Sequence, residues 1–551
     1  MSTLLAPLGW ALARLAPRRG WLLCGMAMAL VVFLLNAGLM AAAGASAGGL
    51  LLAWWLRGFA TGRVLGRYAE RLVAHHALFL ALADLRVWIF RRIAGRALLG
   101  PGFGRASDWL ARLTHDVEAL DGLYLRALMP LFLAVTAGLV AAAALWPVTA
   151  WGGLAALLLT AGAVSAALAF AARAAKAGGA LARQAGDLRA AAADTLAGLR
   201  TLAACGGIEA AAARLAGDDS ALLDAQRRVA RLSGRAAATG VVLAQGALLA
   251  ALGFAAFAWQ GGGATPMVAA ALLVLVAALE PIGALPRAGE ALAVAAAAAA
   301  RLREAAELPP PVADPALPGA APQDGSLCLA GLRFDWNLPD GRRHGVLRGV
   351  DLDVADGQVV AVLGESGIGK SSLLAALLRL APVAGGTVRI GGADLAALTG
   401  ASVRATIAAL PQHAALFAAT IRDNLLLGRP DATEAQLWRA LDLAQLGDFV
   451  RALPERLESF AGEGAAMLSG GQARRLALAR TYLQPGRIML LDEPCAGLDA
   501  ATEEAVFTHL DAARALGGVP RTTLLLLHRL TGAERLDAAW RLRDGRLERA
   551  E

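Results

Sequence analysis

The chain has 551 residues, of which 57% are hydrophobic, with a mean hydropathy of +0.55 and a formal net charge of +8. It is therefore long enough for several domains and too apolar to be soluble throughout. The positive charge does not indicate nucleic-acid binding, because no recognition motif accompanies it and arginine also gathers at the cytoplasmic ends of membrane spans. The four cysteines are far apart and indicate neither a disulfide framework nor a zinc site.

Six apolar stretches are each long enough to cross a bilayer, which takes about 20 residues. They cover residues 21–43, 47–67, 127–146, 148–172, 236–259 and 265–285. Because Arg14, Arg18 and Arg19 precede the first stretch, we expect the N-terminus in the cytoplasm. Six crossings return the chain to the same side, so the region after the last span is expected there as well.

The connections between these spans are unequal. The outer turns at 44–48, 146–147 and 260–263 are very short, whereas the inner connections at 68–126 and 173–235 are long, charged and helix-patterned. We therefore expect membrane helices that continue into the cytoplasm. Local interruptions that form short helices are expected at 104–113 and 199–208.

A proline-rich stretch separates this region from the rest of the chain. A helical run over 290–307 ends at consecutive prolines, and Pro, Ala and Gly dominate as far as residue 323. This composition is typical of a linker. We therefore predict a membrane domain over residues 1–307, a linker over 308–323 and a soluble domain over 324–551.

Charged residues interrupt the second predicted span. Arg57 is followed by Arg63, Arg67, Arg71 and His75, the last four at intervals of four that place them on one helix face. A charge in lipid costs about 2.5 kcal/mol or more, so these side chains either line a translocation path that accepts anions or lie in a solvated cytoplasmic face.

The sixth span contains a second charge, in Glu280 beside the helix breaker Pro281. This acid either lines the same path or marks the end of the membrane segment.

The soluble domain contains the pattern G-x-x-x-x-G-K-S after an apolar strand and before a helical run. The predicted ATP-binding residues of this P-loop are Gly364, Glu365, Ser366, Gly367, Ile368, Gly369, Lys370, Ser371 and Ser372. Glycines allow backbone N–H groups to surround phosphate oxygens, and the helix N-terminus adds a positive dipole end. Lys370, one of only two lysines in the chain, would reach the β- and γ-phosphates, and the Ser371 hydroxyl would bind Mg²⁺.

Two residues flank the P-loop in sequence. Trp336 precedes the strand that enters it and either stacks on a purine or packs in the core. Gln412 lies in a loop between the other motifs, where it could contact Mg²⁺ and the γ-phosphate. Alone, neither residue indicates a function.

A second anion-binding pattern begins at Ser469. Ser469, Gly470, Gly471 and Gln472 open a helical run, with Ser469 as a favourable N-cap. One domain cannot easily surround a nucleotide with both this helix end and its own P-loop. We therefore expect each ATP to be closed by another copy of the domain; the alternative is a helix cap without a ligand.

Acidic residues and a histidine complete the set of candidate site residues in the soluble domain. Asp492 and Glu493 end a buried-type strand, where Asp492 would hold Mg²⁺ and Glu493 would orient or deprotonate the attacking water. Asp499 is placed to bridge two such domains, and His528 follows another apolar strand and could contact the γ-phosphate. Solvated acids and a structural histidine are the alternatives.

In this order, these motifs resemble the ATPase domain of ABC transporters, and six preceding spans with long inner helices resemble an ABC exporter half-transporter. The resemblance implies an all-α transmembrane domain fused to an α/β P-loop ATPase domain. It also implies ATP and Mg²⁺ as ligands, a second half-transporter as partner, and a hydrolytically competent site that uses Lys370, Glu493 and His528.

A narrower resemblance lies in the membrane domain. The stretches 66–75, 85–88 and 116–126 are similar to the CydC-type subunit. That resemblance implies a CydD-type partner, the bacterial inner membrane and a small anionic cargo needed for cytochrome bd assembly, either a thiol (cysteine or glutathione) or haem. The chain departs from this pattern in the unusually short connection between its first two spans.

The arginine face does not discriminate between these cargoes, because haem propionates and glutathione are both anionic. If haem is the cargo, His75 would be an axial ligand; otherwise it is an ordinary helix residue. A homodimeric lipid or multidrug exporter is the alternative function. A non-transporting ATPase and a nucleotide-binding membrane scaffold are further alternatives.

Overall fold

The computed structural model describes residues 2–45, 50–94, 109–110, 112–260, 266–310, 312–337, 342–462, 467–516, 518, 520–532 and 534–550. These residues form two compact units, and each is described by itself. The first ends at Leu308, and the second includes Pro309–Glu551.

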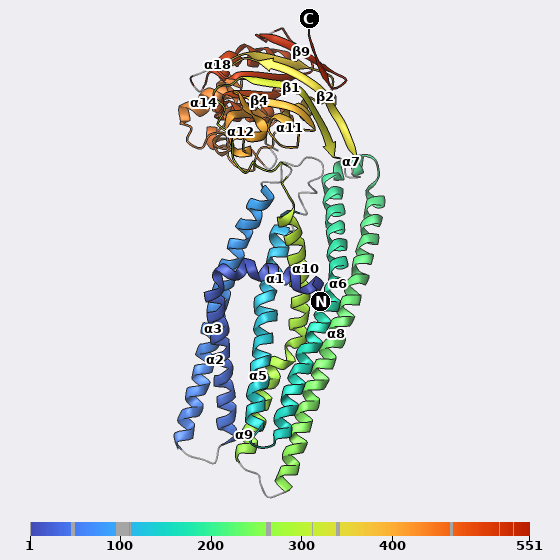
Figure 1. Cartoon of the computed structure of the whole chain (residues 1–551), viewed down its shortest axis with the longest axis vertical. Coiled ribbons are helices and arrows are strands. Elements are labelled where there is room, and N and C mark those ends of the chain that lie inside the picture. Colours follow the sequence, from blue (N-terminus) through green and yellow to red (C-terminus); the bar gives the residue numbers. More distant parts are fainter. Residues whose placement is uncertain are drawn as a thin grey trace. The chain divides into compact units, whose positions relative to one another are not determined.

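In the described residues of the first unit, the secondary structure consists of helices joined by short turns (Figure 1). Its α-helices are α1 (Ser2–Leu15), α2 (Arg19–Gly44), α3 (Leu50–Ala94), α5 (Met129–Leu145), α6 (Ala150–Ala197), α7 (Leu199–Ala204), α8 (Ile208–Gln260), α9 (Pro266–Gly283) and α10 (Leu285–Glu307). A 3₁₀ turn, η1 (Ala16–Arg18), and two π-helices, η3 (Arg112–Asp116) and η4 (Leu123–Leu128), join them.

The long inner helices are confirmed. The helices α3, α6 and α8 have 45, 48 and 53 residues, far more than a bilayer requires, and α6 packs along α8 (Figure 1). The short helix α7 lies within the interruption predicted at 199–208. The interruption at 104–113 and the turns at 44–48 and 260–263 fall largely outside the described residues.

Five described stretches are long and apolar enough to span a membrane. They are Leu5–Gly44, Trp54–Ala94, Leu123–Leu145, Ala150–Ala174 and Pro266–Glu307. They overlap the first four predicted spans and the sixth. The remaining prediction, 236–259, falls in the end of α8, many of whose side chains lie outside the described part of the chain. The helix α1 ahead of the first span was not predicted.

Small residues and a partly buried ion pair contribute to the packing of this unit. Ala288, Ala295 and Ala298 of α10 are fully buried, and a side chain at Gly289 would meet the Ala167 carbonyl oxygen at 2.6 Å, so the helix backbones approach closely. Arg301 donates from Nε and Nη2 to the two carboxylate oxygens of Asp116, at 2.9 and 2.5 Å, and so fixes η3 against α10.

The second unit contains two sheets. The smaller is antiparallel, in the order β2-β1-β4-β5, and the larger has the order β10-β9-β3-β8-β7-β6 and is parallel from β9 to β6. Their strands are β1 (Leu327–Asn337), β2 (Arg343–Val354), β3 (Val359–Leu363), β4 (Gly385–Ile390), β5 (Ala393–Asp394), β6 (Ile407–Leu410), β7 (Ile488–Asp492), β8 (Thr522–Leu527), β9 (Ala538–Arg543) and β10 (Arg546–Arg549).

Helices pack against these two sheets. They are α11 (Lys370–Leu377), α12 (Gly400–Thr406), α13 (Ile421–Leu426), α14 (Glu434–Leu443), α15 (Gly447–Ala452), α16 (Gly470–Leu483), α17 (Ala500–Thr508) and α18 (Leu510–Arg514), with 3₁₀ turns η5 (Leu395–Ala397) and η6 (Arg456–Glu458). Side chains of β3 alternate between two cores: Val359, Ala361 and Leu363 pack with α14 and α16, and Val360 and Val362 pack with α11 and the smaller sheet. The fold class predicted from the sequence is confirmed.

The register of the parallel strands positions the site. Leu363 of β3 pairs with Leu527 of β8, and Asp492 of β7 pairs with Leu526 of β8. The carboxyl ends of these three strands therefore share one edge, where α/β proteins bind their ligands. Segments far apart in the sequence meet there.

Candidate nucleotide-binding and hydrolysis site

The P-loop has the backbone that its glycines predict. Gly367 and Gly369 have φ of +81° and +120°, in the left-handed region that other residues adopt at a cost. A side chain at Gly369 would also meet Val346 Cγ1 at 2.5 Å. The loop runs from the buried strand β3 into α11, which begins at Lys370.

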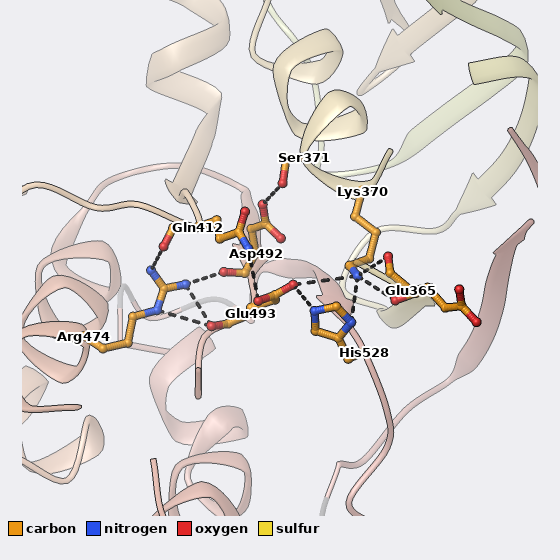
Figure 2. Close-up of polar contacts among 9 residues, drawn as sticks. Glu365, Lys370, Ser371, Gln412, Arg474, Asp492, Glu493 and His528 are labelled. Atoms are coloured by element: carbon orange, nitrogen blue, oxygen red, sulfur yellow. Dashed lines mark hydrogen bonds and ion pairs between the residues drawn. The ribbon is translucent and has the colours of Figure 1, made fainter. Parts of the chain in front are cut away.

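Lys370 folds back onto its own loop. Its Nζ donates to the carbonyl oxygens of Gly364 and Glu365, at 2.6 and 3.1 Å, and lies 3.7 Å from Glu493 Oε1 (Figure 2). The side chain is 4% exposed, and this burial lowers the pKa of the Lys370 ammonium, although Glu493 and Asp492 oppose the shift. The ammonium is thus held mainly by neutral carbonyls that an anionic ligand can replace.

Ser371 and Asp492 lie together as predicted for a metal site. Ser371 Oγ donates to Asp492 Oδ2 at 2.7 Å, and the other oxygen, Oδ1, is buried without a hydrogen-bond partner among the described residues. Burial raises the pKa of the Asp492 carboxyl, and the Ser371 hydrogen bond opposes this. A hydroxyl beside a carboxylate with an unsatisfied oxygen fits Mg²⁺, which prefers oxygen ligands.

Glu493 is the centre of a charged cluster. Its Oε1 lies 2.6 Å from His528 Nε2, and Gln412 Nε2 donates to its Oε2 at 3.4 Å (Figure 2). Its backbone has φ of +50°, a left-handed conformation that is strained for a residue other than glycine. The structure therefore brings Lys370, Gln412, Glu493 and His528 together, with the Gln412 amide directed at Glu493.

Arg474 was missed by the sequence analysis. From α16, Nη1 of its buried guanidinium donates to the carbonyl oxygens of Pro411 and Gln412, at 2.8 and 2.9 Å. Its Nη2 donates to the Asp492 carbonyl and, at 2.9 Å, to that of Glu493. Burial lowers the pKa of Arg474. The only signal in the sequence was the pair Arg474 and Arg475 near the start of a helix, and this pair does not single out Arg474.

Trp336 connects β1 to the P-loop helix. Its Nε1 donates to Ser372 Oγ at 3.0 Å, and its ring meets Phe334 edge-to-face with a centroid distance of 5.1 Å. The side chain is only partly buried, so it both packs in the unit and presents surface. Purine stacking stays a prediction.

The second anion-binding pattern, residues 469–472, is called the signature below, and its residues form a capped helix end. Ser469 and Gln472 make a reciprocal capping box: Ser469 Oγ accepts from the Gln472 N–H at 3.2 Å, and Gln472 Oε1 accepts from the Ser469 N–H at 2.8 Å. Ser469 and Gly470 are exposed. Within the described residues, neither they nor Gly471 and Gln472 hydrogen-bond to the P-loop.

Asp499 also acts as a helix cap. Its carboxylate accepts from the Thr502 N–H at 3.0 Å and from the Thr502 hydroxyl at 2.8 Å, and these bonds lower its pKa. A bridge to a second domain stays a prediction. Leu498 beside it would contact a side chain at Gly471, at 3.1 Å, so this loop lies next to the signature.

In the membrane unit, the predicted arginine face divides into two parts. Arg63 Nη1 donates to Asn36 Oδ1 at 2.8 Å, and Arg67 lies 3.5 Å from Glu280. All four residues line one cavity of about 280 Å³. Arg57, Arg71 and His75 are not among the described residues that line it.

Comparison with known proteins gives matches to both units. Residues 347–496 match the family described as ABC transporter. Over 542 residues the chain is 32% identical to the Escherichia coli glutathione/L-cysteine transport system ATP-binding/permease protein CydC, covering 94% of this chain and 92% of that protein. It is 43% identical over 191 residues to CydD of the same system and organism, covering 35% of this chain and 32% of that protein.

A solved structure shares the fold. The structure of a bacterial Atm1-family ABC exporter with ATP bound superposes with a TM-score of 0.82 at 24% identity, covering 97% of this chain and 94% of that one. At this identity the likeness concerns the fold alone.

Proposed function

The chain belongs to the CydC family of ABC half-transporters, and from this premise we propose that it pairs with a CydD-type half to move glutathione or L-cysteine across the bacterial inner membrane. It is an ATP-hydrolysing transport protein with a multi-pass membrane unit and a cytoplasmic ATPase unit. The N-terminus is proposed to lie in the cytoplasm as well. Cytochrome bd assembly is the process that this transport would serve.

One observation carries the choice of cargo: the similarity to CydC extends over 94% of the chain and therefore includes the membrane unit, which must select what is moved. By contrast, the similarity to the multidrug transporter MDR2 of Trichophyton rubrum covers 38% of this chain, too little to include the whole membrane unit. A homodimeric lipid or multidrug exporter is accordingly the weaker proposal.

In the proposed mechanism, the P-loop holds the ATP phosphates. Its backbone N–H groups and the N-terminus of α11 face the anion, and Lys370 exchanges the carbonyls of Gly364 and Glu365 for the β- and γ-phosphate oxygens. Trp336 stacks on the adenine. Because Trp336 already donates to Ser372 at 3.0 Å, binding of the base is linked to the P-loop helix.

Ser371, Asp492 and Gln412 are the proposed ligands of Mg²⁺. When bound, the ion neutralises charge on the β- and γ-phosphate oxygens. The buried Asp492 Oδ1 without a partner supports this assignment, because a buried oxygen of this kind is costly unless a cation or donor meets it. Gln412 would have to turn from Glu493 to take part.

Glu493 is the proposed general base that receives the proton of the attacking water. In the present arrangement its carboxylate is held 2.6 Å from His528 and 3.7 Å from Lys370. As His528 and Lys370 turn to the γ-phosphate, Glu493 becomes free to accept a proton. Arg474 keeps the strand end in place meanwhile, since it binds the Asp492 and Glu493 carbonyls.

The second nucleotide surface is proposed to act across the subunit boundary. Ser469, Gly470, Gly471 and Gln472 would cap the ATP that the partner's P-loop holds, and Asp499 would bridge the two ATPase units. Two features support this: Ser469 and Gly470 are exposed, and the hydrogen bonds of this helix end stay within its own capping box, with none to the P-loop among the described residues.

Haem is the second candidate cargo, favoured by the geometry of His75. Its Nδ1 lies 2.8 Å from the Arg71 carbonyl oxygen. A carbonyl only accepts, so Nδ1 carries the proton and Nε2 keeps a lone pair that can bind iron. Titration of haem into wild type and His75→Ala tests this: unchanged haem absorption would end the ligand hypothesis.

The proposed function is tested by co-expressing the chain with its CydD-type neighbour and reconstituting the pair in liposomes. We expect glutathione or L-cysteine to stimulate ATP hydrolysis, and labelled thiol to cross the membrane in an ATP-dependent way. Lys370→Ala should abolish both. The cargo assignment would be overturned if neither thiol stimulated ATP hydrolysis and neither crossed the membrane in an ATP-dependent way.

A further inference from the structure

The cavity of about 280 Å³ in the membrane unit carries charges of both signs. Arg63, Arg67 and Glu70 reach it from α3, Glu280 from α9 and the amide of Asn36 from α2. Two guanidinium groups and two carboxylates give a formal charge of zero. The sequence had suggested a wall that accepts anions, but the helix packing adds equal acidic charge to it.

We propose that this cavity binds the α-amino-acid end of the cargo, with the ligand's carboxylate on Arg63 and Arg67 and its ammonium on Glu280 and Glu70. This inference rests on the proposed function and specifies the group that the transporter recognises. L-cysteine carries an adjacent ammonium and carboxylate, and so does the γ-glutamyl end of glutathione.

The two arginines are held differently, which suits them to capture a ligand. Arg63 is partly buried, and its 2.8 Å bond to Asn36 fixes the guanidinium; among the described residues its other N–H groups have no hydrogen-bond partner and could bind a carboxylate. Arg67 and Glu280 form a longer contact of 3.5 Å, with 63% and 68% of their side chains exposed in the single chain. Such an exposed pair is weakly held, so a ligand can separate it.

A dipolar ligand replaces this ion pair without leaving a charge alone. Its carboxylate takes the place of Glu280 beside Arg67, while its ammonium takes the place of Arg67 beside Glu280. A ligand with only negative groups would pair with the arginines but would add negative charge beside Glu280 and Glu70 with no cation to balance it, which is unfavourable. Charge balance thus favours an amino-acid group over a simple anion.

Backbone irregularities and size agree with a binding role. Pro281 lies inside α9, and Pro130 is the second residue of α5, which continues from the π-helix η4; both prolines line the cavity. Prolines and π-helical turns within helices often mark functional sites because they open the regular hydrogen-bonding. At about 30 Å³ per water, the cavity holds roughly nine waters, enough for one amino-acid group but small for a whole drug-sized ligand.

The test uses the complete transporter with its partner, in nanodiscs, and measures binding of labelled L-cysteine by equilibrium dialysis together with stimulation of ATP hydrolysis. N-acetyl-L-cysteine lacks the ammonium, and cysteamine lacks the carboxylate. We expect both analogues to compete at least 10-fold more weakly than L-cysteine. Equal competition by all three thiols would overturn the proposal.

Glu280→Gln is the decisive variant, and Glu118→Gln is its matched control. Glu118 follows η3 and pairs at 3.3 Å with Arg86 of α3, the helix that also carries Arg67; it is similarly exposed, but it is not among the residues that line the cavity. We expect Glu280→Gln to weaken L-cysteine binding at least 10-fold and to abolish its preference over N-acetyl-L-cysteine. Glu118→Gln should preserve both, and indistinguishable behaviour of the two variants would contradict the assignment.

A charge-reversal variant distinguishes a loss of ligand binding from a loss of folding or assembly. The double variant Arg67→Glu/Glu280→Arg restores an ion pair of opposite direction, so it should assemble with the partner yet still bind L-cysteine at least 10-fold more weakly. Wild-type binding of the double variant would overturn the proposal, as would absent L-cysteine binding in the wild type. Retained binding without any thiol transport would instead contradict the proposed function and leave the cavity assignment standing.

Discussion

The hydrolysis site and the membrane cavity both contain opposite charges that pair with one another, but they differ in how firmly these charges are held. Lys370 is 4% exposed, and main-chain carbonyls of the P-loop bind it, whereas Arg67 and Glu280 are 63% and 68% exposed and bind chiefly each other. The P-loop side of the ATP site is thus preorganised by one chain, while the cavity has an open side. An exposed charge inside a membrane span requires water or a second subunit to cover it, so the cargo site is expected to be completed by the partner.

The largest expected effect is on the firmly held site. Glu493→Gln removes the proposed base but keeps its shape, so ATP turnover of the assembled transporter should fall about 10²–10⁴-fold while ATP binding persists. Steady-state hydrolysis and nucleotide binding by filter assay measure the two separately. The Glu118→Gln transporter is the control, and unaffected turnover in Glu493→Gln would mean that the partner's site does the work or that the assignment is wrong.

The second largest effect is expected from the substitution of Arg474, which tests whether the ATP site depends on the hydrogen bonds of this buried guanidinium. Arg474→Ala leaves several main-chain carbonyls without donors, and we expect a stability loss of about 3 kcal/mol. For a unit of this size that corresponds to a melting temperature roughly 6–12 °C lower. Differential scanning fluorimetry of the full complex measures it; a change below about 2 °C would show that water replaces the guanidinium.

A smaller effect is expected at the edge of the ATP site. Trp336→Ala removes both the proposed purine contact and the hydrogen bond to Ser372, a loss of about 1 kcal/mol that weakens ATP binding roughly 5-fold. Trp336→Phe should restore the stacking part alone. If ATP affinity is the same in all three proteins, the tryptophan only packs against Phe334.

The smallest effect on stability is expected in the membrane cavity, and it tests the difference between the two sites. Because the Arg67–Glu280 pair is exposed and long, Glu280→Gln should change the stability of the transporter by no more than about 1 kcal/mol. Thermal unfolding beside the Arg474→Ala complex provides the comparison. A loss as large as that of Arg474→Ala would make the cavity pair structural and remove the stated difference between the two sites.

Sequence reasoning predicted the local structure correctly where it is encoded in consecutive residues. The P-loop, the signature and the strand ending in Asp492 could be recognised because each is a short local pattern in which a glycine or acid has a backbone role. The parallel register then brings Glu493 and His528 together, which strand order alone does not specify. Their distance of 2.6 Å comes from the tertiary structure.

Sequence reasoning failed where the two interacting residues lie far apart along the chain. Arg474 binds carbonyls around residue 411, 63 positions away, and no local pattern encodes such a contact. In the membrane unit, the periodicity of α3 predicted that Arg63 and Arg67 share a face, but Asn36 and Glu280 reach them from other helices. Interhelical packing decides whether that face attracts an anion or a dipolar group.

The helix α16 has a consequence for how a pair of such chains would work. Its first residues are those proposed to cap the nucleotide of the neighbouring subunit, and about one turn further on Arg474 donates to the carbonyl oxygens of Asp492 and of Glu493, this chain's own proposed base. If these first residues contact the partner's nucleotide as proposed, α16 would connect the occupancy of one nucleotide site with the position of Glu493 in the other. We expect the two ATP molecules to be cleaved in a coordinated order, with the timing set by this helix.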